Sequence, residues 1–353
     1  MWRRTISKIP KKYNYVIVGG GSAGCVLANR LTESGSKSVL LVEAGPSDLP
    51  PVIGGKSYRL DSMLRWQIHM PSALMYNLAS TKYNWWYNTV PQENCKNREF
   101  YWPRGRVLGG SSSLNAMVYV RGHGDDQNRW AKEIGDSTWD YDHFLPYFKR
   151  AQTHQEGADH YRGCNGPLHV SYGDVTNSTP LYNAFIEAGV QAGYPRSNDL
   201  NGFQQEGFGR LDMTVNPNTS TRWSAASAYL RPARSRPNLS VVTGTLTDKV
   251  ILEGTTAKGI QVSNYKKAGE TEIIYGNEII LSSGAINSPQ LLQLSGIGNA
   301  EHLKRVGIDP KIDLKGVGEN LQDHLDVSVQ QECKLPGTFR KKYFRPTGFE
   351  PVT

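Results

Sequence analysis

The hydrophobic pattern near the amino terminus predicts a strand, a helix and a second strand. Residues 14–18 form an aromatic and β-branched run that ends directly in glycines, which is typical of a buried strand in a parallel sheet. A helix is expected to follow through about Leu31, and a second apolar run at 38–42 is expected to be the next strand. This order predicts a βαβ unit with parallel strands.

Farther along the chain the pattern loses its period before short strands return. Residues 60–100 are rich in aromatic side chains but show no clean helical or strand period, so we expect a loop that covers another part of the molecule. A helix is expected over 180–192, inside a polar and turn-rich stretch. Four further strands are expected at 239–243, 249–253, 258–265 and 271–281. The predicted fold class is α/β, or α+β overall, with a Rossmann-like domain built on a parallel sheet.

The glycines after the first predicted strand have the spacing of a dinucleotide-binding turn. Gly19, Gly21 and Gly24 form G-x-G-x-x-G. In such a motif the first glycine permits a tight turn, the second lets the backbone approach a pyrophosphate, and the third lets helix and strand pack closely. Ser22 and Ala23 would open the helix, whose amino-terminal amides point at the pyrophosphate.

An acidic residue completes this unit. Glu43 ends the second predicted strand, where a carboxylate can accept hydrogen bonds from an adenosine ribose. A glutamate at this position suits NAD as well as FAD, so the βαβ unit alone leaves the cofactor open. An ordinary glycine turn is the plainer alternative, but the register of strand, glycines, helix, strand and acid argues against it.

Composition argues against a membrane-spanning protein and against a nucleic-acid-binding one. The mean hydropathy is −0.50, and no segment reaches the roughly 18–20 apolar residues that span a bilayer. The net charge of +8 arises at the ends: without the ten cations and one anion of residues 1–12 and 334–353, 30 basic and 31 acidic residues remain. We therefore expect no nucleic-acid surface and two basic, disordered tails, while peripheral membrane contact stays possible.

Cysteine spacing and the first residues bear on metal binding and location. The four cysteines are scattered without a C-x-x-C pair, so no metal site is expected. The acid-free start at residues 1–12 is compatible with a mitochondrial presequence, with a cytoplasmic location as the alternative.

Three longer motifs resemble the glucose-methanol-choline (GMC) oxidoreductase family. Residues 105–116, GRVLGGSSSLNA, resemble its first signature; residues 284–298, which begin GAINSPQLL, resemble its second; and residues 317–324, VGENLQDH, form a third match. The resemblance covers residues 13–330. The second motif also predicts a helix that starts after Gly284, with Pro289 near its beginning.

The resemblance implies that the cofactor is FAD. Besides Gly19, Gly21, Ser22, Ala23, Gly24 and Glu43, the cofactor-binding residues it implies are Arg106, Val107, Gly109, Gly110, Ser111, Asn115, Val118, Val250, Ser283 and Gly284. Some relatives attach the flavin through a histidine at the position held here by Leu114, so the FAD is expected to be noncovalent. The implied FAD-binding domain is discontinuous, over 13–135 and 236–330, and residues 136–235 would be the first part of an incomplete substrate domain.

The resemblance further implies hydride transfer from an alcohol carbon to the flavin. The sequences of residues 187–195, 199–209 and 235–239 resemble those of the choline-oxidising members of the family. This resemblance favours oxidation of choline to betaine aldehyde. Another alcohol or a sugar is the alternative substrate. A quinone or another carrier is the expected electron acceptor.

The family's catalytic base, a histidine in an H-x-x-G-T setting, has no counterpart in this sequence. We therefore leave the catalytic residues unassigned, expect the base to lie beyond Thr353, and expect the chain to turn over negligibly alone. A noncatalytic truncated homologue is the alternative function, and an NAD-dependent Rossmann dehydrogenase leaves the later motifs unexplained.

Three residues are candidates for contact with the substrate. Trp85 and Trp86 could hold a quaternary ammonium by cation–π contact, although core packing is the more common role of such side chains. Asp326 could supply negative charge for the same group, with a solvated acid as the alternative.

Overall fold

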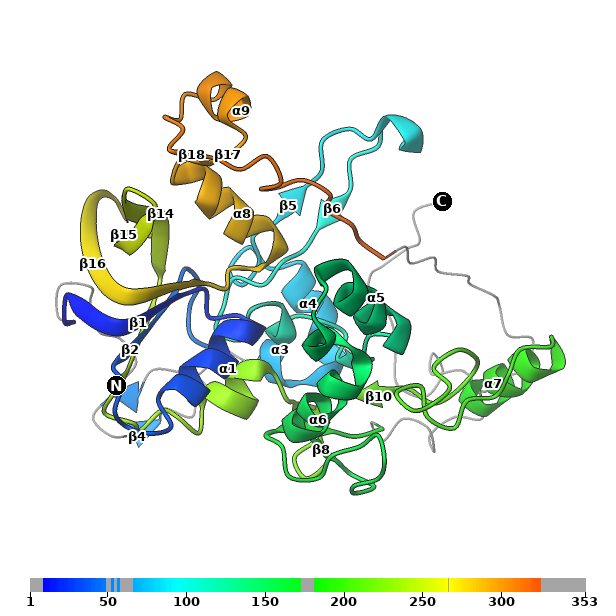
Figure 1. Ribbon diagram of the computed structural model, residues 1–353. Coiled ribbons are helices and arrows are strands. Elements are labelled where there is room, and N and C mark those ends of the chain that lie inside the picture. Colours follow the sequence, from blue (N-terminus) through cyan, green and yellow to red (C-terminus); the bar gives the residue numbers. More distant parts are fainter. Residues whose placement is uncertain are drawn as a thin grey trace, which may run out of the picture.

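In the computed structural model, the two amino-terminal strands and four later strands form one six-stranded sheet (Figure 1). The structure describes residues 9–48, 52–53, 56–57, 66–172, 181–265 and 267–324. The sheet order is β13-β2-β1-β16-β15-β14. The bounds of these strands are Leu239–Thr243, Val39–Glu43, Lys12–Val18, Lys267–Leu281, Thr256–Asn264 and Thr245–Glu253, in the same order. The strands β13, β2, β1 and β16 pair in parallel, and β16, β15 and β14 continue as an antiparallel meander.

The alternation of side chains in β1 explains why both faces of the sheet are covered. Val16 and Val18 are buried in one apolar cluster, which includes Leu291 of α8 (Gly284–Leu294). Ile17 is buried in the other, together with Cys25 of α1 (Ser22–Leu31). Because a strand that is buried on both faces needs apolar residues throughout, the continuous run in β1 fits this place in the sheet.

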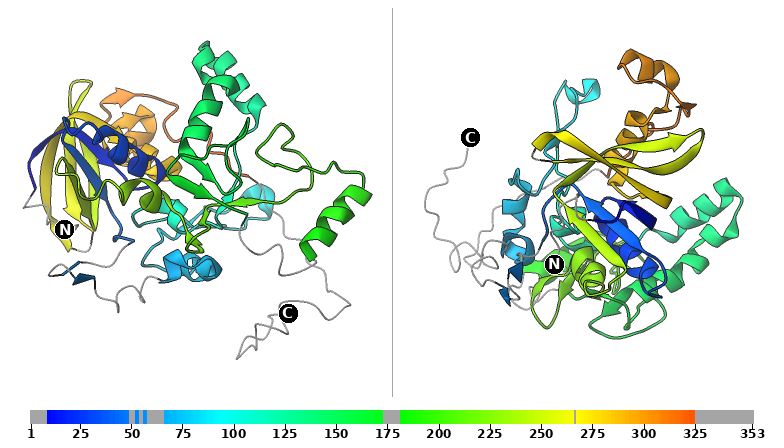
Figure 2. Two further views of the ribbon diagram at one scale, coloured as in Figure 1. Left: turned by 90° about the horizontal axis from the view of Figure 1, so that it is seen from below. Right: turned by 90° about the vertical axis from the view of Figure 1, so that its left-hand side faces the viewer.

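One face is completed by a segment distant in sequence. The π-helical turn η6 (Ala226–Leu230) packs beside α1, and Asn29 Nδ2 donates to the Tyr229 carbonyl at 2.7 Å. Two views show α1 and η6 together on one side of the sheet and α8 on the other (Figure 2). Residues of the predicted substrate region therefore cover the Rossmann-like sheet.

The remaining helices lie away from the sheet, with α7 at the opposite end of the molecule (Figure 1). They are α3 (Trp66–His69), α4 (Leu74–Leu78), α5 (Gly124–Ile134), α6 (Tyr141–Ala151), α7 (Leu181–Gln191) and α9 (Ala300–Arg305), with 3-10 turns η2 (Pro71–Ala73), η3 (Glu93–Cys95), η4 (Gly110–Ser113) and η5 (Ser137–Trp139). Within the described ranges, no helix is both long and apolar enough to cross a bilayer.

Short strand pairs connect these parts. They are β3 (Val52–Ile53) with β4 (Lys56–Ser57), β5 (Tyr87–Asn88) with β6 (Tyr101–Trp102), β7 (Val118–Tyr119) with β10 (Asp212–Met213), β8 (Gln152–His154) with β9 (Leu168–Val170), β11 (Val215–Asn216) with β12 (Thr221–Arg222), and β17 (Ile297–Gly298) with β18 (Ile312–Asp313). The β7–β10 pair joins the two sides of the boundary expected at 135, so the division into domains stays a prediction.

Most of the expected elements are confirmed, and three details differ. The βαβ unit, the helix at α7 and the four later strands are present, although β14 and β16 begin before residues 249 and 271. The short helices α3 and α4 were not expected, because neither is long enough to show a period. Pro289 lies inside α8 rather than near its start, because the helix begins already at Gly284. Of the expected tails at 1–12 and 334–353, residues 1–8 and 334–353 lie outside the described residues, whereas Ile9 is buried and β1 begins at Lys12.

Candidate functional site

The glycine motif forms the turn between β1 and α1, and each glycine has a distinct steric reason. Gly19 has a φ of +99°, and a Cβ there would lie 2.6 Å from the Ser282 carbonyl oxygen. A Cβ on Gly24 would lie 2.0 Å from the Gly19 carbonyl oxygen, so helix and turn pack directly on each other. A Cβ on Gly21 would meet no atom closer than 3.8 Å. Gly21 therefore leaves open space where the first and third glycines allow close packing.

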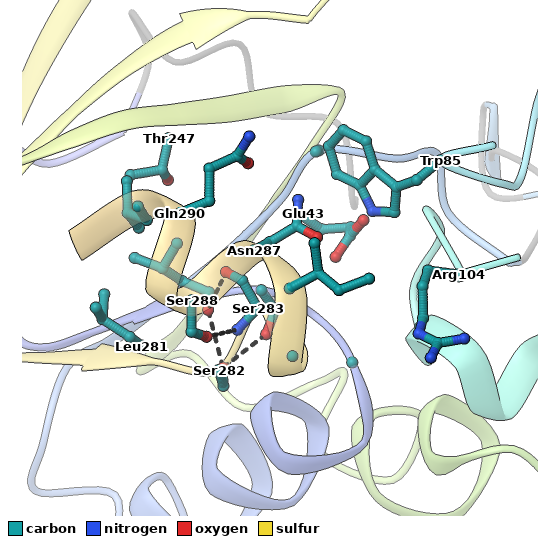
Figure 3. Close-up of a pocket in the computed structure, with 18 of the residues that line it drawn as sticks. Glu43, Trp85, Arg104, Thr247, Leu281, Ser282, Ser283, Asn287, Ser288 and Gln290 are labelled. Carbon is teal, nitrogen blue, oxygen red and sulfur yellow. Dashed lines mark hydrogen bonds between the residues drawn. The ribbon is translucent and has the colours of Figure 1, made fainter. Parts of the chain in front are cut away.

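That open space is a cavity of about 950 Å³ at the carboxyl ends of three parallel strands. Val18 of β1, Glu43 of β2 and Leu281 of β16 line it, as do the first residues of α1 and α8. Figure 3 shows the side chains of Glu43, Trp85, Thr247 and Asn287 gathered around it. Two helix amino termini, with their free N–H groups and positive dipole ends, thus meet at one cavity, an arrangement that favours an anionic group such as a pyrophosphate.

Glu43 is buried at the edge of this cavity and fixes two backbone turns. Its Oε2 accepts a hydrogen bond from the Gly20 amide and its Oε1 one from the Gly45 amide, each at 2.8 Å. Burial raises the pKa of Glu43 to about 7, against the lowering effect of these two amides and of the Arg106 charge. A carboxylate oxygen can accept more than one bond, so Glu43 keeps acceptor capacity toward a ribose.

The loop of the first GMC-like motif forms a second wall. Gly105, Gly110 and Ser111 line the cavity, and the Gly109 amide donates to the Gly20 carbonyl at 2.7 Å. Gly110 has a φ of +55°, and a Cβ there would lie 2.7 Å from the Gly21 Cα. The two glycine turns are therefore in direct backbone contact, and a larger residue at Gly110 would separate them.

An aromatic pair closes a third side. The rings of Trp85 and Tyr87 are stacked, with centroids 5.9 Å apart and planes 4° from parallel, and both residues line the cavity. The Tyr87 hydroxyl accepts a hydrogen bond from Asn287 Nδ2 of α8 at 2.8 Å. This bond ties the 84–88 segment to the helix on the other side of the cavity.

The structure brings together only part of the predicted cofactor residues. Gly19, Gly21, Ser22, Ala23, Glu43, Gly110, Ser111, Ser283 and Gly284 line the cavity. Gly24, Arg106, Val107, Gly109, Asn115, Val118 and Val250 do not. Gly24 and Gly109 support the turns from behind, and Arg106 stacks on Tyr265 with its guanidinium carbon 4.4 Å from the ring centroid. Val107 and Val250 are core residues, and the Val250 amide already donates to Ser295 Oγ at 2.8 Å.

The structure describes two of the three predicted substrate residues, Trp85 and Trp86, and they lie differently with respect to the cavity. Trp85 lies against the cavity and packs edge-on against Tyr265, so its indole is part of the aromatic pair. Trp86 points elsewhere, since its backbone has a φ of +61° and its ring packs on Tyr101 at 4.8 Å. Asp326 lies outside the described residues.

Several lining residues were not predicted. They include the strand segment Thr245, Leu246, Thr247 and Asp248, the helical residues Ala285, Ile286, Asn287, Ser288 and Gln290, and Arg104 and Tyr87. The helical group stands inside the second motif, so the position of Ser283 and Gly284 at a helix start was the available signal. The strand segment had no such signal in the sequence, because its place at the cavity depends on the pairing of β14 in the sheet. Among the described residues, no group of three or more histidines, cysteines or acids could hold a metal ion.

Comparison with known proteins adds a family and close relatives. The family model of GMC oxidoreductases matches residues 13–326. Mitochondrial choline dehydrogenase of Mus musculus is 55% identical over 95% of this chain and 54% of its own length. The oxygen-dependent choline dehydrogenase of Staphylococcus xylosus is 48% identical over 92% of this chain and 55% of its own length. The chain thus spans about half the length of the curated relatives it matches.

Solved structures give the same picture. Pyridoxine 4-oxidase from Mesorbium loti matches with a TM-score of 0.75 and 35% identity, over 85% of this chain and 55% of that one. An FAD-dependent oxidoreductase from Chaetomium thermophilum matches with a TM-score of 0.75 and 30% identity, over 86% of this chain and 51% of that one. The Rossmann-like fold predicted from the glycine motif is therefore confirmed.

Proposed function

Because the chain belongs to the GMC oxidoreductase family, we propose that it binds FAD and forms part of a flavoprotein that oxidises an alcohol, with choline as the substrate. The observation that carries the proposal is the cavity itself, which is bounded by a glycine turn, two helix amino termini and a buried acid. These are the groups that hold the pyrophosphate and ribose of a dinucleotide. The FAD-dependent neighbour from Chaetomium thermophilum supports FAD over NAD.

Each wall has a defined part in holding the cofactor. The amides at the start of α1, with Gly21 beside them, would hold the pyrophosphate, and Glu43 would accept hydrogen bonds from the ribose. Ser111 and the amides around Gly110 would add donors from the opposite wall. Bound FAD supplies a two-electron acceptor for the hydride of the alcohol carbon. The protein's own contribution is to orient it and to exclude water from one side with the Trp85–Tyr87 pair.

A binding experiment tests the cofactor assignment. Titration of FAD with the purified chain should quench flavin fluorescence with saturation, and NAD added in excess should leave the bound FAD in place. Equal competition by NAD and FAD would contradict the assignment, because a site for the whole flavin dinucleotide must distinguish the two. The flavin should leave the protein on acid precipitation, since Leu114 cannot form the bond that a histidine forms.

The substrate assignment draws on the relatives named as choline dehydrogenases. In the whole flavoprotein, choline added without air should bleach the yellow flavin absorbance, whereas a sugar should not. Asp326 is proposed to supply negative charge for the trimethylammonium group. Its replacement, Asp326→Asn, should raise the KM for choline far more than the KM for 3,3-dimethylbutan-1-ol, the uncharged isostere. Equal effects on both alcohols would assign Asp326 to structure alone.

The location and the electron acceptor are separate proposals. We place the protein in mitochondria, in line with the relatives of Mus musculus and Homo sapiens whose names include that location. Cell fractionation with an antibody to the chain tests it, and recovery in the cytosol alone would contradict it. A quinone or another carrier is proposed as acceptor, and the rates of reoxidation of the reduced protein by a soluble quinone and by oxygen would decide between them.

A further inference from the structure

Arg222 is buried behind the loop that forms the second wall of the cavity. It ends β12 and is 1% exposed. Its Nε donates to the Ile68 carbonyl at 2.8 Å, and its Nη1 donates to the Ser112 carbonyl at 3.2 Å and to Asn115 Oδ1 at 2.7 Å. The guanidinium therefore fixes two positions of the first GMC-like motif, one through the backbone and one through a side chain.

The positive charge of Arg222 has no counter-ion in the part of the chain that the structure describes. Its hydrogen-bond acceptors there are neutral oxygens, no carboxylate lies within ion-pair distance, and Nη2 is buried without a hydrogen-bond partner. Burial lowers the pKa of Arg222 to about 10, which leaves the group charged at neutral pH. A buried charge of this kind is destabilising unless something compensates it.

A second arginine nearby, whose side chain is 32% exposed, shows the contrast. Arg231 reaches Asp48 Oδ2 at 3.2 Å, so its charge has a buried carboxylate as partner. Both arginines approach the segment 66–69, since His69 Nε2 contacts the Asp48 carbonyl at 3.1 Å and Arg222 binds the Ile68 carbonyl. The two cations, one with a carboxylate partner and one without such a partner in the described part of the chain, thus lie in one region.

The loop that Arg222 holds has two sides. Gly110 and Ser111 face the cavity, and the next residue, Ser112, directs its carbonyl to Arg222 and its hydroxyl to the Ala225 amide at 3.0 Å. Only the thickness of one backbone segment therefore separates the charge from the wall that the bound cofactor would meet. Because Arg222 is itself buried, its charge is poorly screened by water and acts strongly on its neighbours.

We propose that Arg222 is a positioning residue for the flavin: it holds residues 112–115 in place, and its charge, which has no carboxylate partner among the described residues, stabilises negative charge on the flavin ring. This inference rests on the FAD binding proposed above. When the alcohol carbon gives up a hydride, two electrons and one proton reach the ring, the hydroxyl proton of the alcohol goes to a base, and the reduced ring is left with one negative charge. A nearby cation raises the midpoint potential of that couple.

Sulfite provides a readout that does not depend on turnover. The sulfur lone pair of sulfite adds to N5 of the flavin, a nitrogen–sulfur bond forms, and the displaced electron pair leaves a negative charge on the ring without any other reactant. We expect Arg222→Gln to raise the Kd of FAD-loaded protein for sulfite by about tenfold or more. The midpoint potential of its two-electron couple should also fall, by about 30 mV for each tenfold decrease in the equilibrium constant for reduction of the flavin.

Two matched variants separate charge from structure. Arg222→Lys keeps the charge but loses the planar fork, so its sulfite Kd and potential should stay close to those of the wild type. The double variant Asp48→Asn with Arg231→Gln removes the neighbouring ion pair without a change in net charge, and should leave both values unchanged.

Each outcome has one meaning. Wild-type sulfite affinity and potential in FAD-loaded Arg222→Gln would overturn the inference. If that variant does not retain FAD, Arg222→Lys decides: wild-type values support the inference, while altered values or loss of FAD overturn it. A wild-type protein that binds no FAD would instead overturn the proposed function, so the two failures are distinguishable.

Discussion

A Cβ atom on Gly24 would lie 2.0 Å from the carbonyl oxygen of Gly19. This distance is far below any van der Waals contact, so the α1 helix can approach the turn only because residue 24 lacks a side chain. Three residues earlier the situation is reversed, because a Cβ on Gly21 would meet nothing closer than 3.8 Å. The same motif therefore contains one glycine required by packing and one that borders the cavity.

The two glycines should separate folding from cofactor binding. In Gly21→Leu the new side chain would occupy the cavity without clashing with a protein atom. The variant should therefore unfold at nearly the wild-type temperature and retain no FAD. Gly24→Ala overpacks the contact with Gly19 and should destabilise the protein by about 1–3 kcal/mol. Thermal unfolding and the ratio of flavin to protein absorbance measure the two effects. Full flavin content in Gly21→Leu would refute the placement of the cofactor.

Glu43 should make the stability of the flavin-free protein depend on pH. Its pKa is about 7 in the folded state against an ordinary value of 4.5, so the folded protein keeps a proton that the unfolded chain releases between these pH values. The contribution of Glu43 to the free energy of unfolding should therefore be fully present below pH 4.5. It should be lost as the pH rises through about 7. The loss amounts to roughly 3 kcal/mol by order of magnitude.

The variant Glu43→Gln tests this dependence. It should be less stable at low pH, because a glutamine cannot accept from both the Gly20 and Gly45 amides, but its stability should change less over the same window. Denaturant unfolding of the flavin-free protein at several pH values gives the two slopes. Parallel slopes for wild type and variant would show that another group titrates.

Leu114 should act through packing and not through the flavin bond. It is 3% exposed and belongs to a small cluster with Ile68, Tyr83 and Val107. Leu114→Ala should lower the free energy of unfolding by about 2–5 kcal/mol, while all flavin remains extractable by acid as it is in the wild type. Colour that stays in the wild-type precipitate would contradict noncovalent binding.

The Tyr87 hydroxyl should slow the release of FAD. Tyr87→Phe keeps the stack on Trp85 but removes the bond to Asn287 that ties the two sides of the cavity together. A net loss of about 1 kcal/mol would raise the dissociation rate about fivefold, measured by the recovery of free-flavin fluorescence after dilution of the FAD-loaded protein. Tyr119→Phe, which removes a hydroxyl that accepts from Arg121 Nε at 3.2 Å, is the control and should leave the rate unchanged.

The parts of the site that sequence could predict are those set by local rules. A tight turn needs glycine at Gly19, and a strand end places Glu43 at the sheet edge, so both followed from spacing alone. Spacing could not show that Val250 is buried in the core while Thr247 and Asp248 of the same strand line the cavity; the strand pairing is irregular between Thr247 and Lys249. Adjacent Trp85 and Trp86 differ for a similar reason, since the φ of +61° at Trp86 sends the two rings apart.

The place of β1 between β2 and β16 has a consequence for biosynthesis. Ser282 Oγ donates to the Val18 carbonyl across a separation of 264 residues, so the floor of the cavity is assembled from the two ends of the described chain. At roughly 5–20 residues per second, β1 waits on the order of 10–50 s after it leaves the ribosome for its partner. During that time its apolar edge is available to other chains. The wall of the cavity that β1 and β16 share can therefore form only after β16 has emerged.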